Sequence, residues 1–201
     1  MKTSTEVLLP IGAHPLAIDQ ARSLASIARS AAASLSVTSR SHGDVLAYLV
    51  NAGIAVELHL KAIMIVARGG RVTKGHNLSA LYDEFPDFLK DFIEWQYKQL
   101  MPPPGWDVVL TALTFRAQQP PTPGPTPRPR YQTFAEAIDS SSRIFERSRY
   151  FFERVNDQDW EIFSYAPGAL DAVTVSLDRA YVHFLAGDFD PKPSSPSAHA
   201  A

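Results

Sequence analysis

Hydrophobic residues recur at helical spacing along most of this chain. Residues 14–35 carry such a pattern, Pro15 suits their first turn, and residues 43–68 are almost entirely apolar. A Ser-rich stretch at 34–41 separates the two segments, and Gly69-Gly70 follows the second. Glycine is the residue most often found just after a helix, because it adopts left-handed backbone angles without strain. The pattern therefore predicts two long helices in the first third of the chain.

Shorter segments with the same periodicity follow. Asn77 suits the N-cap of a helix over 78–85, and Pro86 opens another apolar run over 87–100. A short amphipathic segment lies at Trp106–Phe115, and two longer helices are expected over 133–155 and 167–186. No segment alternates apolar and polar residues next to hairpin signals, so we expect no strands. The predicted class is all-α: an up-and-down helical bundle of four main helices plus short helices.

The helical pattern bounds the predicted domain. Residues 1–12 read as an irregular N-terminal arm, 13–187 as a single helical domain, and 188–201 as a disordered tail. More than half of the sixteen prolines fall between residues 102 and 129. Proline-rich segments favour extended backbone without internal hydrogen bonds. We therefore expect a stiff surface excursion at 118–130.

Composition excludes several classes of function. The chain has 201 residues, a formal charge of −2 and no cysteine. Disulfides, thiolate catalysis and cysteine-based zinc sites are therefore excluded, and nucleic-acid binding would need a local basic patch. The histidines show no metal-ligand spacing, so we expect neither a metal nor a cofactor. The N-terminus lacks a signal-peptide pattern, and polar residues interrupt the 45–67 run, which favours burial in protein over a membrane span. We expect a cytoplasmic protein.

Two charges interrupt the apolar helix at 43–68. Glu57 and Lys61 are one turn apart, and on a helical wheel they share a narrow stripe with Gly53, Met64 and Arg68. A buried charge is costly unless it is paired. The stripe is either the wetted face of the helix, carrying a satisfied ion pair, or the lining of a cleft where Glu57 or Lys61 meets a ligand. Gly53 permits close approach by another helix or a bound molecule.

Two further residues are candidates for the same cleft. Arg149 lies at the edge of the apolar ridge of the 133–155 helix, with Glu153 one turn later. It would form an inter-helix salt bridge, for which Glu57 is a candidate partner, or bind a phosphate. His76 enters a helix, where backbone N–H groups favour anions. It could act as acid, base or phosphate donor, or Asn77 could simply cap the helix.

Three groups of residues resemble one known family. They are Ala55-Val-Glu57-Leu-His-Leu-Lys61-Ala-Ile, then Gly69-Gly70 with His76-Asn77-Leu78-x-x-Leu81, and Phe145-Glu-Arg-Ser-Arg149-Tyr150-Phe-Phe-Glu153. Their order and spacing resemble the HEPN superfamily, small all-α domains of prokaryotic toxin–antitoxin systems, phage defence, and nucleotide- or RNA-handling proteins. The similar pieces cover 45–81 and 145–153, less than half of the chain.

The resemblance implies a helical bundle, commonly a homodimer, whose polar residues gather in a cleft. It implies nucleotide or RNA as the ligand, and a cognate antitoxin or nucleotidyltransferase as partner protein. Ribonuclease members carry Arg-x(4–6)-His, frequently with Asn after the Arg. Arg71 and His76 have that spacing, but Val72 replaces the Asn, and the match precedes the usual position. Carried onto this chain, the catalytic candidates are His76 and Arg149, and the ligand-binding candidates are Glu57, Lys61, Asn77, Tyr150 and Glu153.

Two functions remain open from the sequence. One is a HEPN-like protein that binds nucleotide or RNA, with metal-independent endoribonuclease activity in a defence or toxin–antitoxin setting. The alternative is a non-catalytic, dimeric protein-interaction module, in which the polar cluster is structural and an aromatic surface of Trp95, Tyr97 and Trp106 meets a partner.

Overall fold

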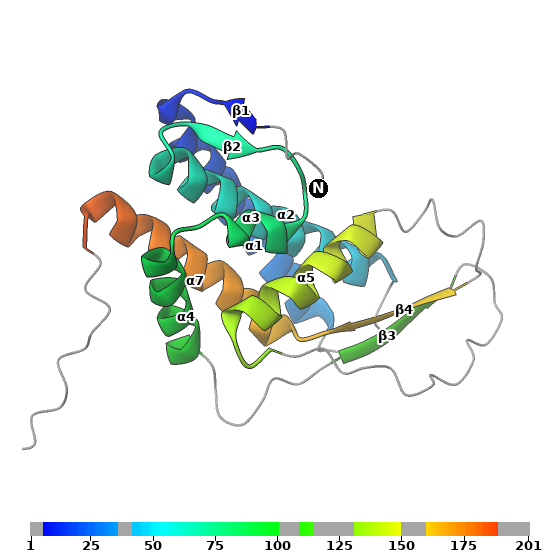
Figure 1. Cartoon of the computed structure of the whole chain (residues 1–201). Helices are drawn as coiled ribbons and strands as arrows, with labels where there is room; N and C mark the ends of the chain where they lie inside the picture. The colour runs from blue at the N-terminus through cyan, green and yellow to red at the C-terminus, as the bar shows by residue number, and fades with distance from the viewer. Residues whose placement is uncertain (1–5, 36–41, 101–108, 115–130, 150–159, 189–201) are drawn as a thin grey trace, which may run out of the picture.

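A computed structural model of the chain describes residues 6–35, 42–100, 109–114, 131–149 and 160–188. Helices dominate this part of the chain, as Figure 1 shows, so the predicted all-α class is confirmed. The helices of the described residues begin and end close to the predicted positions. They are α1 (His14–Leu35), α2 (His42–Ala67), α3 (Leu78–Asp83), α4 (Asp87–Leu100), α5 (Phe134–Arg149) and α7 (Pro167–Ala186).

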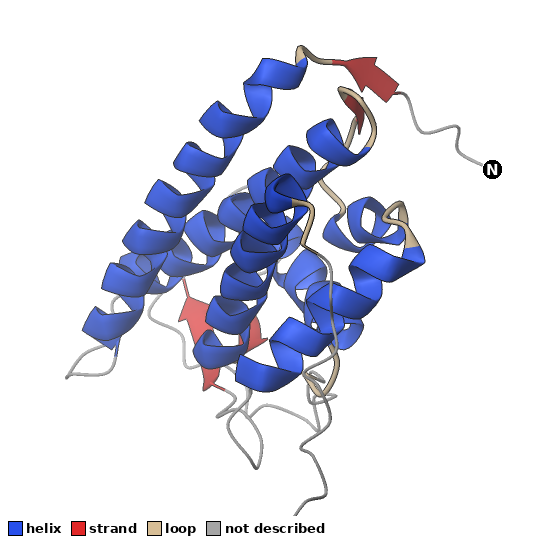
Figure 2. Ribbon diagram, turned by 90° about the vertical axis from the view of Figure 1, so that its left-hand side faces the viewer, coloured by secondary structure: helices blue, strands red, loops and turns tan. Residues whose placement is uncertain are grey.

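Helix α2 lies at the centre of the arrangement. It runs beside α1 (Figure 2) and also contacts α3, α5 and α7. Helices on several sides explain why α2 is apolar almost all round, since a helix with one exposed face would carry polar residues there. By length and composition alone, Asp44–Ala67 could cross a membrane, with a mean hydropathy of 1.7. However, 67% of this window is buried inside the structure, and a core helix passes the same test.

The apolar side chains form two clusters. The larger cluster joins α2 to α3, α4, α5 and α7, and its centre includes Leu60, Ile63 and Phe92. A smaller cluster forms around the first turns of α2, where Tyr48 and Leu49 pack against Tyr165 and Leu170. Tyr97 is also fully buried, and its hydroxyl donates a hydrogen bond of 2.9 Å to the carbonyl oxygen of Tyr131. The expected aromatic surface of Trp95, Tyr97 and Trp106 is therefore wrong for Tyr97.

The expectation of no strands is also wrong. Strand β1 (Glu6–Leu8) pairs with β2 (Arg71–Thr73), and β3 (Val109–Thr114) pairs with β4 (Trp160–Tyr165); both pairs are antiparallel. The expected irregular arm thus contains β1 and a short 3-10 helix, Ile11–Ala13. Part of the expected amphipathic segment at 106–115 is strand β3. The two strands of each pair are distant in sequence, so no hairpin turn joins them and no turn signal in the sequence predicts the pairing.

Several predictions concern residues outside the described part of the chain. These are the Pro-rich excursion at 118–130, the end of the 133–155 helix beyond Arg149, and the expected tail beyond residue 188. The last helix lies within the described part, and its prediction is confirmed. Helix α7 begins at Pro167 and ends before Gly187, whose φ of 70° is the left-handed conformation that glycine accepts readily.

The link between α2 and α3 turns the chain back along α2. Gly69 and Gly70 have φ values of 60° and 91°, which non-glycine residues rarely adopt. A Cβ on Gly70 would lie 2.3 Å from the carbonyl oxygen of Leu9, and the Leu9 N–H donates a 2.8 Å hydrogen bond to the Gly70 carbonyl. Strand β2 then pairs with β1, and the chain reaches His76 beside the middle of α2.

Two ion pairs join α1 to α7. Arg22 Nε lies 2.7 Å from Asp178 Oδ1, and Arg29 Nε lies 2.6 Å from Asp171 Oδ1. Arg22 and Arg29 are seven positions apart on α1, and Asp171 and Asp178 are seven positions apart on α7, so the two contacts are two turns apart. Because the earlier arginine pairs with the later aspartate, the helices run antiparallel. His59 of α2 lies 3.6 Å from the same Asp178 oxygen. The His59 ring and the Arg22 guanidinium lower the pKa of the Asp178 carboxyl, although partial burial opposes them.

This lowered pKa gives a pH-dependent prediction. Because the folded state favours ionised Asp178, its stabilisation is complete above the unfolded-state pKa of about 3.9 and is lost as the pH falls through the lower folded-state value. At pH 7, Asp178→Asn should lower the free energy of unfolding by at most about 1 kcal/mol, because solvent screens partly exposed ion pairs. Urea denaturation at pH 7 and below pH 3 checks this. An equal difference at both pH values would contradict the assignment.

Candidate functional site

Three of the residues predicted for the cleft meet at one buried carboxylate. Glu57 is only 6% exposed, and Lys61 Nζ donates a 2.7 Å hydrogen bond to its Oε1. His76 Nδ1 lies 2.8 Å from Oε1 and 3.0 Å from Oε2 of the same carboxylate. The predicted ion pair of Glu57 and Lys61 is therefore confirmed, and the structure adds His76 as the second partner. We call Glu57, Lys61 and His76 the Glu57 cluster.

Exposure increases across the Glu57 cluster from the carboxylate outward. The side chain of Glu57 is 9% exposed, that of Lys61 21% and that of His76 54%. A buried carboxylate between two cationic or hydrogen-bonding partners keeps its charge satisfied. The side chains of Lys61 and His76 remain partly exposed to solvent. Lys61 and His76 therefore lie near the surface, and both contact the buried carboxylate of Glu57.

The contact with Glu57 determines how the His76 ring is oriented. An ionised carboxylate only accepts hydrogen bonds, so Nδ1 must carry a hydrogen. In the neutral ring Nε2 is then an acceptor, and it can take up a proton. No described residue forms a hydrogen bond to Nε2. A histidine fixed through Nδ1 with an accessible Nε2 is the arrangement that general acid–base catalysis uses.

The neighbours of Glu57 on α2 show what its helical stripe contacts. One turn before Glu57, a Cβ on Gly53 would lie 2.1 Å from Cδ2 of Phe145 on α5. Because Gly53 has no side chain, α5 can pack closely against α2 at this position. One turn beyond Lys61, Met64 is fully buried. The stripe is mostly covered by protein, so the interpretation of a wetted face is wrong, and solvent reaches it chiefly around Lys61 and Arg68.

Asn77 caps the helix that follows His76. Its Oδ1 accepts a 2.8 Å hydrogen bond from the backbone N–H of Ala80, which confirms the predicted N-cap. The next backbone N–H, that of Leu78, donates a 3.1 Å hydrogen bond to Ser142 Oγ on α5. These two bonds fix the start of α3 against α5. They hold the backbone of the adjacent His76 in place, which is the role that Asn77 has in the structure.

The remaining predicted site residues are at or beyond the end of α5. Arg149 is the last residue of α5; its side chain, Tyr150 and Glu153 lie outside the described part of the chain. The contacts of α5 nevertheless show toward which end of α2 its last residues lie. Phe145 contacts Gly53, whereas Ser142 reaches the start of α3. Residues later in α5 therefore lie toward the beginning of α2, and the described partners of Glu57 are Lys61 and His76.

A second polar group ties the link to the end of α2. Arg68 forms ion pairs with Glu84 and Glu6, and Thr73 Oγ1 donates a 2.6 Å hydrogen bond to Glu84. This group joins α2, β1, β2 and the end of α3, so it holds the segment that carries His76. No pattern in the sequence indicates a role for Glu84 or Thr73. Arg68 was placed on the stripe, but its partners are distant in sequence, and no local spacing identifies them.

No metal site forms in the described ranges, where no three histidine, aspartate or glutamate side chains gather. The link that carries His76 also has two exposed cationic residues, Arg71 and Lys74. Arg71 belongs to β2 and pairs with Leu8. The groups that the Glu57 cluster offers to a ligand are the Lys61 ammonium and the His76 imidazole, which suit an anion such as a phosphate.

Comparison with known proteins assigns no relative to this chain. Its sequence matches no family model, and neither the curated proteins nor the solved structures contain a significant match. The Glu57 cluster and its surroundings are therefore the basis for a functional assignment.

Proposed function

We propose that this is a HEPN-like protein that binds nucleotide or RNA at the Glu57 cluster and cleaves RNA without a metal ion. The observation that carries the proposal is the contact of His76 Nδ1 with the buried Glu57 carboxylate. It fixes the ring and leaves Nε2 as the reactive nitrogen. The protein would act as a cytoplasmic homodimer in a defence or toxin–antitoxin setting, with a cognate antitoxin or nucleotidyltransferase as partner.

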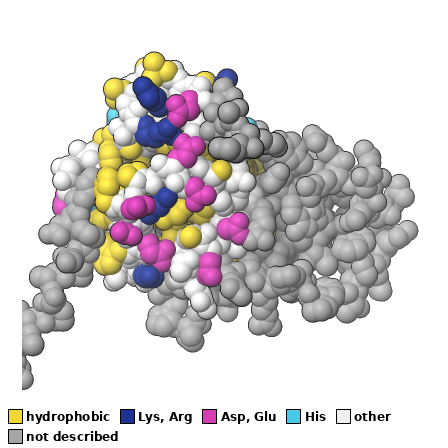
Figure 3. Space-filling view, in the orientation of Figure 1, with side chains coloured by type: hydrophobic (Ala, Val, Ile, Leu, Met, Phe, Trp, Pro, Cys, Tyr) yellow, Lys and Arg dark blue, Asp and Glu magenta, His cyan; other side chains and the backbone are white. Residues whose placement is uncertain are grey.

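Charge at the surface supports a phosphate ligand at this site. Arg71 and Lys74 are exposed on the link that carries His76, and Lys61 lies beside it. The face that carries α3 and α4 is less suitable. Figure 3 shows acidic side chains spread over α3 and α4, where Asp83, Asp87 and Asp91 are exposed. Such a face repels a nucleic-acid backbone, which favours the link over α4 as the binding region.

The proposed reaction is transesterification within the RNA backbone. The ribose 2′-oxygen attacks the adjacent phosphorus, the bond from phosphorus to the 5′-oxygen breaks, and the products end in a 2′,3′-cyclic phosphate and a 5′-hydroxyl. His76 Nε2 takes the proton of the 2′-hydroxyl and returns a proton to the leaving oxygen. Lys61 stabilises the charge that develops on the phosphate oxygens. Glu57 orients His76 by accepting the hydrogen bond from its Nδ1.

The decisive experiment uses single-stranded RNA in EDTA. We expect cleavage by the wild-type protein, and a loss of about 100-fold in the His76→Ala variant, because general acid–base groups typically contribute two to four orders of magnitude. His183→Ala is a matched control, since His183 is a partly exposed histidine on α7. DNA of the same sequence should remain intact because it lacks the 2′-hydroxyl. Product ends are read by mass spectrometry.

Fluorescence anisotropy with the same oligonucleotides separates binding from cleavage. Intact RNA after long incubation, together with salt-sensitive binding that weakens in Lys61→Gln, would contradict the ribonuclease activity and retain the binding function. Intact RNA without binding would contradict both. An equal cleavage rate in wild-type protein and His76→Ala would show that the activity does not depend on the Glu57 cluster.

One observation favours the second candidate, a non-catalytic dimeric interaction module. Glu57 is buried and both of its oxygens have partners, as expected for a polar group that fixes the packing of helices. For such a module, His76→Ala should leave every biochemical property unchanged, and the thermal unfolding temperature should not respond to nucleotides. These outcomes are opposite to those of the first candidate.

A further inference from the structure

Helix α1 has an exposed side without charged residues, and Figure 2 shows this helix at the edge of the helical arrangement. The residues of α1 that are buried lie on the opposite side, next to α2: Ile18, Ala21, Ala25 and Ala28. The residues on the open side share about 80° of the helical wheel. All are exposed, and we call them the outer stripe: Leu16, Gln20, Ser23, Ile27 and Ser30.

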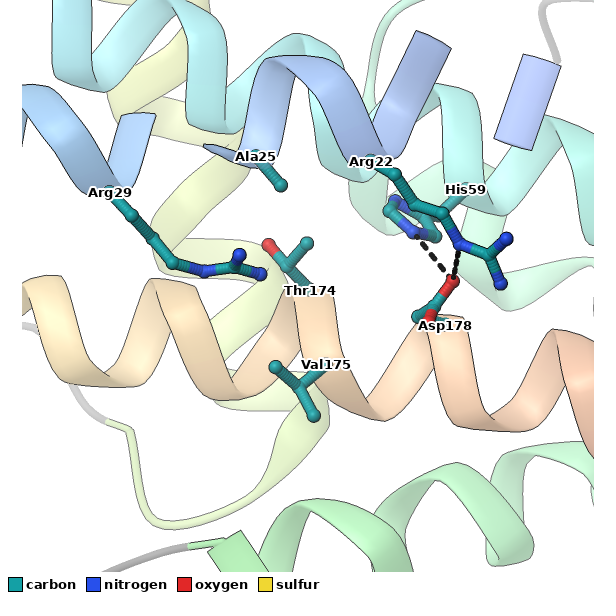
Figure 4. Close-up of a pocket in the computed structure, with 7 residues that line it drawn as sticks. All are labelled: Arg22, Ala25, Arg29, His59, Thr174, Val175 and Asp178. Atoms are coloured by element: carbon teal, nitrogen blue, oxygen red, sulfur yellow. Dashed lines mark hydrogen bonds and ion pairs between the residues drawn. The ribbon is translucent and has the colours of Figure 1, made fainter. Parts of the chain in front are cut away.

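The charged residues of α1 lie beside the outer stripe or away from it. Figure 4 shows Arg22 and Arg29 pointing from α1 toward α7, where they bind Asp178 and Asp171. Asp19 is the remaining charged residue of α1 and lies at the edge of the outer stripe. Helix α4 carries five charged residues among fourteen, whereas α1 carries three among twenty-two. A solvent-exposed helix face usually carries charges, so the outer stripe has the composition of a face that packs against protein.

The serines of the outer stripe are compatible with burial. Ser23 Oγ donates a 2.9 Å hydrogen bond to the carbonyl oxygen of Asp19, and Ser30 Oγ donates a 3.0 Å hydrogen bond to that of Ser26. Because both hydroxyl hydrogens are bonded within α1, covering these side chains leaves no donor unpaired. Small side chains also allow two helices to approach closely.

The outer stripe is complementary to a second copy of itself. Leu16 and Ile27 are 75% and 51% exposed, so covering them removes apolar area from water. Leu16 precedes Gln20 by four positions, and Ile27 follows Ser23 by four. In an antiparallel pair of α1 helices with a two-fold axis midway between Gln20 and Ser23, Leu16 therefore faces Ile27 of the partner subunit at both ends. Between them the Gln20 amide can donate to the Ser23 hydroxyl oxygen of the partner subunit.

From this arrangement we propose that two copies of the chain associate through their outer stripes, with the α1 helices antiparallel. The proposal rests on the homodimer of the proposed function and assigns its interface. Helix α1 has 22 residues and is about 33 Å long. A contact about 10 Å wide along it covers roughly 300–400 Å² on each copy, less than the ~800 Å² of a standard interface. The dimer is therefore weak, with a dissociation constant in the micromolar range.

Sedimentation equilibrium of the full chain measures this association. Leu16→Glu and Ile27→Glu should each weaken the dimer at least about 100-fold, because each places two unpaired carboxylates in a symmetric interface. Both positions are exposed in the monomer, so circular dichroism should show an intact fold. Phe88→Glu is the matched control, because Phe88 is also 51% exposed but lies on α4. This control and His76→Ala should dimerise as the wild type does.

The double variant Leu16→Glu/Ile27→Lys tests the antiparallel register. It places a carboxylate opposite an ammonium group at both ends of the contact, so it should dimerise at least about tenfold more tightly than Leu16→Glu. In a parallel pair, like charges would meet and no recovery would occur. The chain has no cysteine, which permits a second test. Under mild oxidation, a mixture of Leu16→Cys and Ile27→Cys should form a disulfide-linked dimer, and neither variant should do so alone.

The outcomes separate this interface from the rest of the proposed function. A wild-type chain that stays monomeric at about 1 mM, where a micromolar dimer is nearly complete, would overturn both the interface and the homodimer. The outer stripe would then be left to a different protein, and RNA cleavage by such a monomer would retain the role of the Glu57 cluster. A dimer unaffected by Leu16→Glu and Ile27→Glu would overturn the interface alone. Dissociation without recovery in the double variant and without cross-linking in the mixture would overturn the antiparallel pairing.

Discussion

Replacing Glu57 with alanine should lower the free energy of unfolding by about 3 kcal/mol, the low end for breaking a buried ion pair. The low end applies because Lys61 and His76 are partly exposed and can recover water. The variant should also lose RNA cleavage, because the His76 ring is no longer held. Chemical denaturation gives the stability, and the RNA assay in EDTA gives the activity.

The Glu57→Gln variant separates stability from catalysis. Glutamine retains the size of glutamate and can still accept a hydrogen bond from Lys61, so the loss of stability should be smaller than in Glu57→Ala. Its amide can donate to Nδ1 of His76, which would leave the hydrogen on Nε2. The ring could then no longer act as a base through Nε2. We expect a fall in kcat, a nearly unchanged KM, and an altered pH profile of cleavage.

Two outcomes would contradict the assigned role of Glu57. Full cleavage activity in a folded Glu57→Gln protein would show that the carboxylate does not orient a catalytic histidine. A stability equal to that of the wild type in Glu57→Ala would show that the contacts with Lys61 and His76 contribute nothing to the fold. His183→Ala again serves as the control for nonspecific effects of removing a histidine.

The long helices could be predicted because their signals are local. The period of apolar residues, the Gly69-Gly70 pair, Asn77 and Gly187 place the helices to within a few residues. The strands could not be predicted in the same way. A three-residue strand such as β1 is too short to show alternation, and its partner β2 lies more than sixty residues later. Only the folded chain brings the two segments together.

The candidate site was partly predictable for the same reason. Glu57 and Lys61 are one turn apart on one helix, so their ion pair follows from spacing alone. The addition of His76 depends on the link from α2 turning back through Gly70 and β2, which no local pattern specifies. His59 was noted in the sequence only as a histidine without metal-ligand spacing. Its burial beside Asp178 depends on the packing of α7 against α2.

A matched seven-residue spacing was the available signal for the α1–α7 contact. Arg22 and Arg29 repeat on one helix as Asp171 and Asp178 do on another. Equal spacing of opposite charges is compatible with two ion pairs between the helices. It leaves open whether the helices run parallel or antiparallel, and whether they contact each other at all. Tertiary packing decides both, so no sequence pattern specifies the contact between α1 and α7.

A methyl group at Gly53 should destabilise the protein by about 2 kcal/mol, because insertion of extra volume into a packed core costs about 1–3 kcal/mol. The added Cβ would lie 2.1, 2.4 and 2.8 Å from Cδ2, Cγ and Cβ of Phe145. All three atoms belong to a side chain that is only 2% exposed, so the whole phenyl group would have to move. Alanine's helix preference, worth about 1 kcal/mol over glycine, offsets part of this cost.

The Phe145→Ala background tests the cause of that loss. Without the ring the added methyl group meets no obstacle, so Gly53→Ala should become neutral or stabilising, and the sign of its effect should reverse. Gly12→Ala is the matched control, because a Cβ there has no atom within 4 Å. Urea denaturation of the four proteins in the double-mutant cycle measures the coupling. A destabilisation by Gly53→Ala that is unchanged in the Phe145→Ala background would show that the glycine serves something other than the close approach of α5 to α2.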